Sequence, residues 1–410
     1  MDKELAPGKL PAAADEALGR LLSREDRISD LIAFLAALDP EPLLGVLGLP
    51  IQRARVRREV RLDGQAGNAD LVVSDEAGPV ALLEVKASAA QHGNQFERYD
   101  AWAKAQTPPA RCYLVALDGE SLGAPDGWVT EPSLARLVRS WQDSSNPHAA
   151  WLASAAAGIF EGWTTQADGK LGSAAGSIVG DLVARRMASA LLGVSSNPGI
   201  LTRATRQSGG GAAMVLAWLP WPGQPPHPTA WLCADFRSTA RDRPAAPWML
   251  RLGVEAGTSD KVPAAQARVT AHDLAVTILD MLTYSAAQQA LRQAGEEDLA
   301  ACLRPRRGTH DGLRRTPDAY GLGEWRANAA RPGAAARHPV LFQDNLDDGG
   351  YRIASLIDVD VANLDRHQLA RLMLAALGHV QAKVLHGAGE PPAPAGTKVD
   401  SAPARTPAAS

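Results

Sequence analysis

The fold prediction for this chain depends on two apolar segments, ADLVV at residues 69–73 and PVALLEVK at residues 79–86. Both have the length of a strand, and a short turn-forming stretch separates them, which predicts a β-hairpin. Successive side chains of a strand point to opposite faces, so Glu84 and Lys86 share one face. Asp70 lies near the start of the first segment, and a hairpin lets it approach Glu84.

Charged groups at the end of an apolar central strand are costly to bury unless they have a partner or a function. A Glu–Lys ion pair is a common structural feature, and Asp70 taken alone is most simply a turn residue. Two close carboxylates, however, repel each other unless a cation neutralises them. Oxygen ligands of this kind suit Mg²⁺ or Mn²⁺. The combined pattern therefore predicts a divalent-metal site, with a structural ion pair as the alternative.

The segments around this hairpin predict a mixed sheet. Apolar residues of helical period follow Ser23, which with Asp26 predicts a capping box at a helix start. We expect a strand over residues 51–62, a helix over 92–106 and a buried strand over 111–117. The order is helix, three strands, helix, strand, in which the last strand returns by a crossover.

Three further side chains in these helices are candidate site residues. Gln95 and Tyr99 lie four residues apart and therefore share a helix face. Glu25 lies in the first turn of the earlier helix and could add a third acid. Its alternative explanation is the favourable placement of a carboxylate at a helix N-terminus.

Residues 23–117 resemble the PD-(D/E)XK nuclease superfamily, which has the restriction-endonuclease-like fold. Asp70 and the Glu84–Lys86 tripeptide match its acid and acid-x-Lys motif, Glu25 its first-helix acid, and Gln95–Tyr99 the Q-x-x-x-Y of some branches. Ala69 departs from the family's proline, but it supplies no ligand. The resemblance implies an αβββαβ core with a mixed central sheet, an α/β fold class.

The resemblance also implies metal-dependent hydrolysis of phosphodiester bonds, with Mg²⁺ or Mn²⁺ as the cofactor. It assigns metal ligation to three carboxylates and one backbone carbonyl, namely those of Asp70, Glu84, Glu25 and Val85. Lys86 would orient or deprotonate the attacking water and offset negative charge in the transition state. Gln95 and Tyr99 would position the phosphate or Lys86.

The expected partner is a nucleic acid, most simply DNA, in a setting such as restriction or phage defence. The chain has a net charge of −3, so any nucleic-acid surface must be local. Arg53, Arg55 and Arg57 share one strand face and could contact phosphates, although a solvated strand face explains them equally well. Two other functions stay open, a catalytically inactive nucleic-acid-binding or scaffolding module and an RNA nuclease.

The domain prediction rests on turn-rich and polar stretches. We expect a lead at 1–22, the nuclease domain at 23–141, an α+β domain at 147–387 and a disordered tail at 388–410. The α+β domain, whose role the sequence does not indicate, could bind a protein partner or a second copy of the chain. Within it we expect one long helix over residues 264–294.

Four tryptophans lie on candidate strands of the α+β domain: Trp218, Trp221, Trp231 and Trp248. Core packing is the default interpretation of such residues, and base stacking is the alternative. Three separate cysteines exclude a cysteine-rich zinc site and fit a reducing cytoplasm. The charged start and the lack of a long apolar segment predict neither a secretion signal nor a membrane span.

Overall fold

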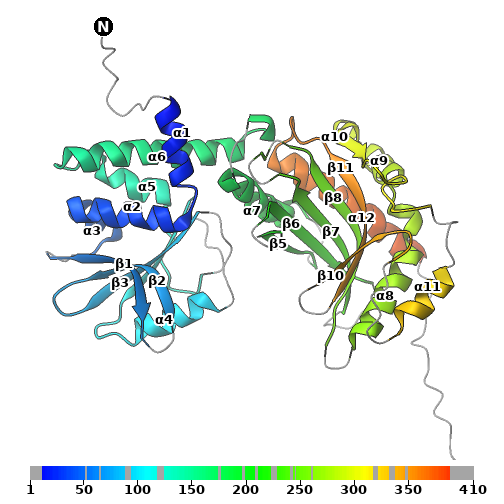
Figure 1. Ribbon diagram of the computed structural model, residues 1–410, viewed down its shortest axis with the longest axis horizontal. Helices are drawn as coiled ribbons and strands as arrows, with labels where there is room; N and C mark the ends of the chain where they lie inside the picture. Colours follow the sequence, from blue (N-terminus) through cyan, green and yellow to red (C-terminus); the bar gives the residue numbers. More distant parts are fainter. Residues whose placement is uncertain are drawn as a thin grey trace, which may run out of the picture.

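The computed structural model describes the chain from residue 12 to residue 387, with short gaps (Figure 1). The described ranges are 12–50, 53–63, 66–87, 94–117, 124–173, 177–195, 199–207, 211–222, 229–240, 243–244, 246–259, 262–316, 322–331, 338–346 and 350–387. The predicted tail at 388–410 and the first half of the predicted lead lie outside these ranges, as does the predicted helix start at residue 92.

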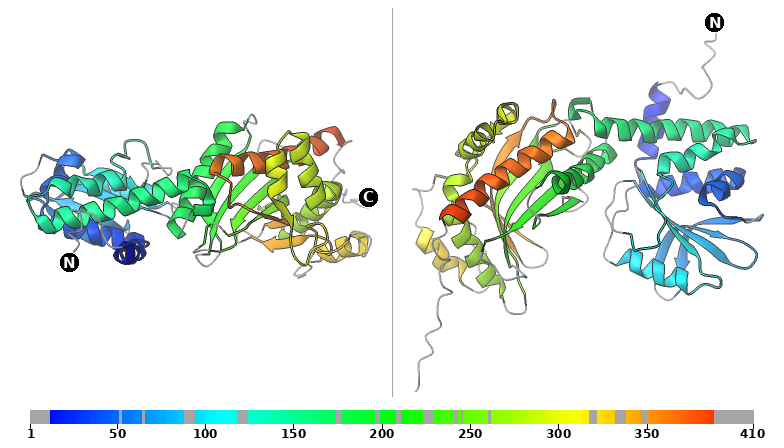
Figure 2. Two further views of the ribbon diagram at one scale, coloured as in Figure 1. Left: turned by 90° about the horizontal axis from the view of Figure 1, so that it is seen from above. Right: turned by 180° about the vertical axis from the view of Figure 1, so that it is seen from behind.

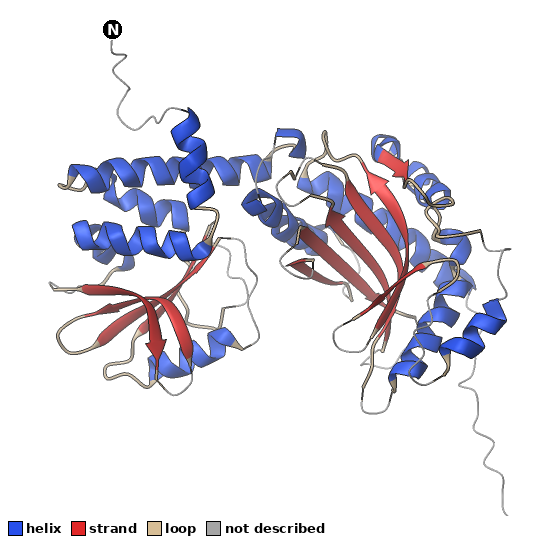
Figure 3. Ribbon diagram, viewed as in Figure 1, coloured by secondary structure: helices blue, strands red, loops and turns tan. Residues whose placement is uncertain are grey.

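The chain is mixed α/β and forms two lobes, each with a sheet that packs against helices (Figure 3). The N-terminal lobe contains α1 (Ala12–Leu21), α2 (Glu25–Leu38), α3 (Glu41–Leu47), β1 (Arg55–Leu62), β2 (Gly67–Ser74), β3 (Pro79–Lys86), α4 (Gln95–Lys104), β4 (Arg111–Ala116), α5 (Leu134–Arg139), η1 (Ser140–Asp143) and α6 (Pro147–Asp168).

The C-terminal lobe follows α6. It contains η2 (Leu171–Ser173), α7 (Ser177–Val194), β5 (Leu201–Arg206), β6 (Ala213–Pro220), β7 (Ala230–Ser238), β8 (Trp248–Ala256), α8 (Ala264–Thr277), η3 (Leu279–Met281), α9 (Tyr284–Gln293), α10 (Glu297–Cys302), β9 (Leu303–Pro305), α11 (Leu322–Ala329), β10 (Phe342–Asn345), β11 (Tyr351–Val359) and α12 (Arg366–Gly387). None of the described helices combines the length and the apolarity that a membrane crossing requires.

The first sheet has the strand order β1-β2-β3-β4. The three strands β1 to β3 form an antiparallel meander, and β4 pairs parallel with β3 after α4. The predicted order of helix, three strands, helix and strand is therefore present. Between the first helix and the first strand, α3 is an additional helix that the sequence analysis did not predict.

Successive side chains of a strand point to opposite faces of the sheet, and helices cover both faces of this sheet. Leu71, Leu83 and Val85 face α2, α3 and α5, and belong to the larger hydrophobic core. Val72 and Leu82 face α4 and form a smaller core with its aromatic residues. Burying a side chain of this size stabilises the fold by about 1.5–3 kcal/mol. Even-numbered residues of β3, including Glu84, therefore lie on the α4 face.

The second sheet is antiparallel, with the order β10-β11-β8-β7-β6-β5 and β9 paired to the end of β11. Helices α7, α8 and α12 contact one face of it. Seen from behind, α7 and α12 lie in front of the strands (Figure 2). The apolar residues on that face continue the larger core through α6 and α7 into the N-terminal lobe.

Two local predictions were wrong, and in both cases a competing contact is the reason. The capping box at Ser23 and Asp26 is absent, because Ser23 Oγ donates to the Arg20 carbonyl at the end of α1 and Asp26 accepts from Arg24. The single helix expected over residues 264–294 is divided into α8 and α9. Its second part begins at Thr283, whose side chain caps Ala286 N, and the Tyr284 amide donates to Asp311.

Candidate functional site

The site is centred on the C-terminal end of β3, where Glu84 and Lys86 share one face as predicted, and this face is the one that α4 covers. Lys86 Nζ lies 2.6 Å from Glu84 Oε1. Only 2% of the Glu84 side chain and 6% of the Lys86 side chain are exposed. The two side chains thus form a buried pair, at the end of a strand that is otherwise apolar.

Asp70 joins this pair from β2 because the β2–β3 hairpin aligns Leu71 with Leu83. Its Oδ2 accepts a hydrogen bond from Val85 N at 2.8 Å. The antiparallel register also places Asp70 opposite Glu84, and the charge of Asp70 contributes to the raised pKa of Glu84. The predicted approach of the two acids is therefore present.

Glu25 reaches the same end of β3 from the first turn of α2. Its Oε1 accepts a hydrogen bond from Ala87 N at 2.9 Å, and its Oε2 lies 3.9 Å from Lys86 Nζ. The side chain is 21% exposed, more than that of Glu84 or Lys86. Glu25 thus brings a third carboxylate to Lys86, in addition to lying at a helix N-terminus.

Gln95 and Tyr99 project together from α4, one turn apart. Gln95 Nε2 donates to Glu84 Oε1 at 2.9 Å and to the Tyr99 hydroxyl at 3.0 Å. The Tyr99 hydroxyl in turn donates to the Asn68 carbonyl at the start of β2. These contacts fix the Glu84 carboxylate and tie α4 to β2.

The electrostatics of the site reflect burial and an excess of acids. Burial, followed by the charge of Asp70, raises the pKa of Glu84 from 4.5 to about 7. Burial also raises the pKa of Asp70. Burial opposes the charged form of Lys86, but the three carboxylates around it raise its pKa above the usual value. Lys86 is therefore a fixed positive charge, and one lysine faces three acids.

This donor set fits a hard divalent cation in one respect. Glu84 Oε2 is buried and has no hydrogen-bond partner among the described residues, so an oxygen lone pair is left for a cation. The described residues contain no group of three or more His, Cys, Asp or Glu side chains arranged to hold a metal ion. The predicted ligand set of Asp70, Glu84 and Glu25 therefore stays a prediction. The role of the Val85 carbonyl stays a prediction.

The predicted phosphate-contact arginines lie on β1 and just before it. Arg55 and Arg57 are exposed on β1, and Arg53, which precedes the strand, is exposed and pairs with Glu76 at 3.2 Å. Glu59 pairs with Arg58 and not with these three arginines. The exposure of the three side chains is compatible with either predicted role, phosphate contact or a solvated face.

One residue at the site was missed by the sequence analysis. Arg185 of α7 donates to the Ala87 carbonyl through both terminal nitrogens, at 3.2 and 3.3 Å. It is 7% exposed. The peptide groups of Ala87 are thus held on one side by Glu25 and on the other by Arg185. Arg185 lies in an alanine-rich helix, 98 residues from Ala87 in the chain. Its neighbours in the sequence therefore do not indicate that it contacts the end of β3.

We compared the chain with protein-family models, with curated proteins and with solved structures, and none of them matches it.

Proposed function

We propose that this chain is a divalent-metal-dependent nuclease that hydrolyses phosphodiester bonds of DNA, on a restriction-endonuclease-like core. The observation that supports the proposal most is the convergence of Asp70, Glu84 and Lys86 at the end of β3. The three residues come from two neighbouring strands, and Glu25 and Gln95 add contacts from two different helices. A purely structural ion pair needs one acid per lysine, and this cluster has three.

Each residue has a distinct part in the proposed chemistry. Asp70 and Glu84 would hold the cation, with Glu25 beside them and the Val85 carbonyl as a further ligand. When bound, a divalent cation supplies polarisation of the scissile phosphate and lowers the pKa of a water molecule. Lys86 stabilises the negative charge that develops on the phosphate, because its raised pKa keeps it protonated.

The deciding experiment is cleavage of plasmid DNA and of single-stranded DNA in the presence of Mg²⁺ or Mn²⁺. We expect Asp70→Asn and Lys86→Met to lower the rate by about 10²-fold or more, because each removes a charge that acts at the phosphate. Glu76→Gln is the matched control, since Glu76 is an exposed acid in the turn before β3. A rate that the first two variants leave unchanged would contradict the proposal.

The burial of Glu84 and Lys86 favours one competing function, a nuclease-like fold that binds nucleic acid without cutting it. In that case wild type and both variants bind DNA equally and none cleaves it. RNA of the same sequence belongs in the same assay, because the chemistry at Glu84 does not distinguish the two polymers.

A further inference from the structure

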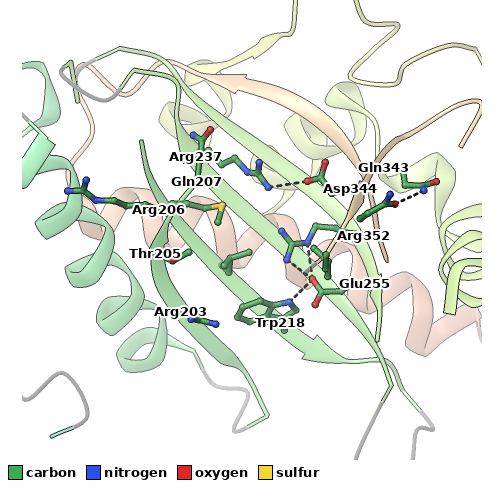
Figure 4. Close-up of a pocket in the computed structure, with 14 residues that line it drawn as sticks. Arg203, Thr205, Arg206, Gln207, Trp218, Arg237, Glu255, Gln343, Asp344 and Arg352 are labelled. Carbon is green, nitrogen blue, oxygen red and sulfur yellow. Dashed lines mark hydrogen bonds and ion pairs between the residues drawn. The ribbon is translucent and has the colours of Figure 1, made fainter. Parts of the chain in front are cut away.

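The second sheet has an open face that the nuclease proposal does not use. Helices α7, α8 and α12 contact the opposite face, so alternate residues of β5 to β8 and β11 point away from the core. Side chains on the open face surround a cavity of about 760 Å³ (Figure 4). Cavities that bind small molecules span about 300–1,000 Å³, so this one has an appropriate size.

An apolar strip crosses the middle of the cavity. Met214, Leu216 and Trp218 occupy alternate positions of β6 and line it. The strand registers place Arg203 of β5 beside Leu216 and Arg237 of β7 beside Met214. The strip therefore has a guanidinium group on either side.

Small residues lie beside Trp218 on the neighbouring strands. Cys233, Gly253 and Ala354 follow Trp218 in register across β7, β8 and β11. Position 253 requires glycine, because a Cβ there would clash with a backbone carbonyl of β11. Trp218 Nε1 donates to Glu255 Oε2 at 3.0 Å, which fixes the edge of the indole ring. The indole is thus held in one orientation at the cavity wall.

The lining of the cavity contains more arginines than acids. It contains four arginines and two acids: Arg203, Arg206, Arg237, Arg352, Glu255 and Asp344. Asp235, which is fully buried beneath the cavity, accepts hydrogen bonds from two of the arginines, with Arg352 at 2.8 Å. Asp235 thus fixes these two guanidinium groups and offsets their charge.

Arg203 differs from the other arginines of the cavity. It is exposed, and it has no hydrogen-bond or ion-pair partner among the residues that the structure describes. A guanidinium at the rim, without a carboxylate beside it, is free to pair with an anion of a ligand.

We propose that this cavity binds a nucleotide, with the base against the strip of Met214, Leu216 and Trp218 and a phosphate at Arg203. A ligand that combines a flat ring with a nearby anion matches the alternation of apolar and cationic side chains across the sheet. The same chemistry is present in a free nucleotide and in one unit of a polynucleotide. The inference is independent of the chemistry at Glu84.

The test is isothermal titration calorimetry of the full chain in EDTA with adenosine triphosphate, pyrophosphate and a short oligothymidylate. We expect adenosine triphosphate or the oligonucleotide to bind, and Arg203→Glu to weaken that binding by about tenfold or more. Arg307→Glu is the matched control, because Arg307 is an exposed arginine outside the cavity. We expect Trp218→Ala to weaken nucleotide binding by about tenfold without changing that of pyrophosphate. Trp218→Phe should retain most of the affinity.

The outcomes answer two separate questions: whether the site exists, and whether its ligand is a free nucleotide or a polynucleotide. Tight binding of adenosine triphosphate assigns a free nucleotide, and preference for oligothymidylate assigns a polynucleotide. Absence of binding for both probes, or equal binding by wild type and Arg203→Glu, overturns the proposal. Pyrophosphate that binds as tightly as adenosine triphosphate also overturns it, because the ring then contributes nothing. Thermal unfolding of each variant identifies any loss of fold, and Arg203→Glu remains decisive because Arg203 is exposed.

Discussion

The ionisation of Glu84 provides a quantitative test of the candidate site. Burial and Asp70 raise its pKa from 4.5 to about 7 in the folded chain. Between these two pH values the folded state holds a proton that the unfolded state has released, so stability falls as the pH rises. The stabilisation by protonated Glu84 is fully present below the pKa of the unfolded state, and it is lost as the pH rises through the pKa of the folded state. One pKa unit corresponds to about 1.4 kcal/mol, so the loss approaches about 3 kcal/mol.

Glu84→Gln should remove this dependence on pH. In EDTA, we expect the free energy of unfolding of the variant, relative to wild type, to rise by about 2.5 kcal/mol from pH 5 to pH 8. Urea denaturation measures it, and Glu76→Gln should show no such trend because Glu76 is 79% exposed. Burial lowers the pKa of His338 to about 3, so the contribution of His338 to the free energy of unfolding rises with pH in the same range. This contribution is the same in wild type and variant, and it therefore cancels in the comparison.

Added Mg²⁺ extends the same experiment. At pH 8 it should stabilise wild type, in which a cation replaces the proton of Glu84, and leave Glu84→Gln unchanged. A difference between variant and wild type that stays constant from pH 5 to pH 8 would refute the reasoning. It would mean that Glu84 remains ionised throughout, as the acid of a structural ion pair with Lys86.

Four other substitutions test the surroundings of both sites and the stability of α6. Tyr99→Phe should lower the free energy of unfolding by about 1 kcal/mol, because the Asn68 carbonyl loses its donor; urea denaturation measures it. Arg185→Ala leaves the Ala87 carbonyl without two donors and should cost about 1–3 kcal/mol, with slower plasmid cleavage as a second measurement. Gly253→Ala should lower stability by at least about 2 kcal/mol, because its Cβ would clash with backbone. Gly158→Ala, in the open middle of α6, should raise the melting temperature, since alanine favours a helix by about 0.5–1 kcal/mol.

Local periodicity was enough to predict the core of the candidate site. The alternation of a strand places Glu84 and Lys86 on one face, and a hairpin with a short turn brings Asp70 beside them. The four-residue spacing of Gln95 and Tyr99 likewise predicts a shared helix face. These relations involve residues close in the chain, or strands joined by one turn, so they follow from the sequence pattern.

Relations between distant segments could not be predicted in this way. The break between α8 and α9 depends on Asp311, whose carbonyl and side chain accept hydrogen bonds from Tyr284 and Ser285. A helical pattern in the sequence does not indicate that contact. The same holds for the cavity on the second sheet, because the strand order that aligns Trp218 with Gly253 is set by tertiary pairing.

Helix α7 physically connects the two proposed sites. Asp181 pairs with Arg206 at the rim of the cavity, and one turn later Arg185 holds the Ala87 carbonyl beside Lys86. Both side chains are buried, so α7 cannot shift without changing one contact or the other. A ligand that draws Arg206 away from Asp181 therefore acts on the element that positions the end of β3. Arg185→Ala supplies the discriminating measurement: if the sites are coupled through α7, this variant abolishes any effect of a bound nucleotide on cleavage while leaving nucleotide affinity within about twofold.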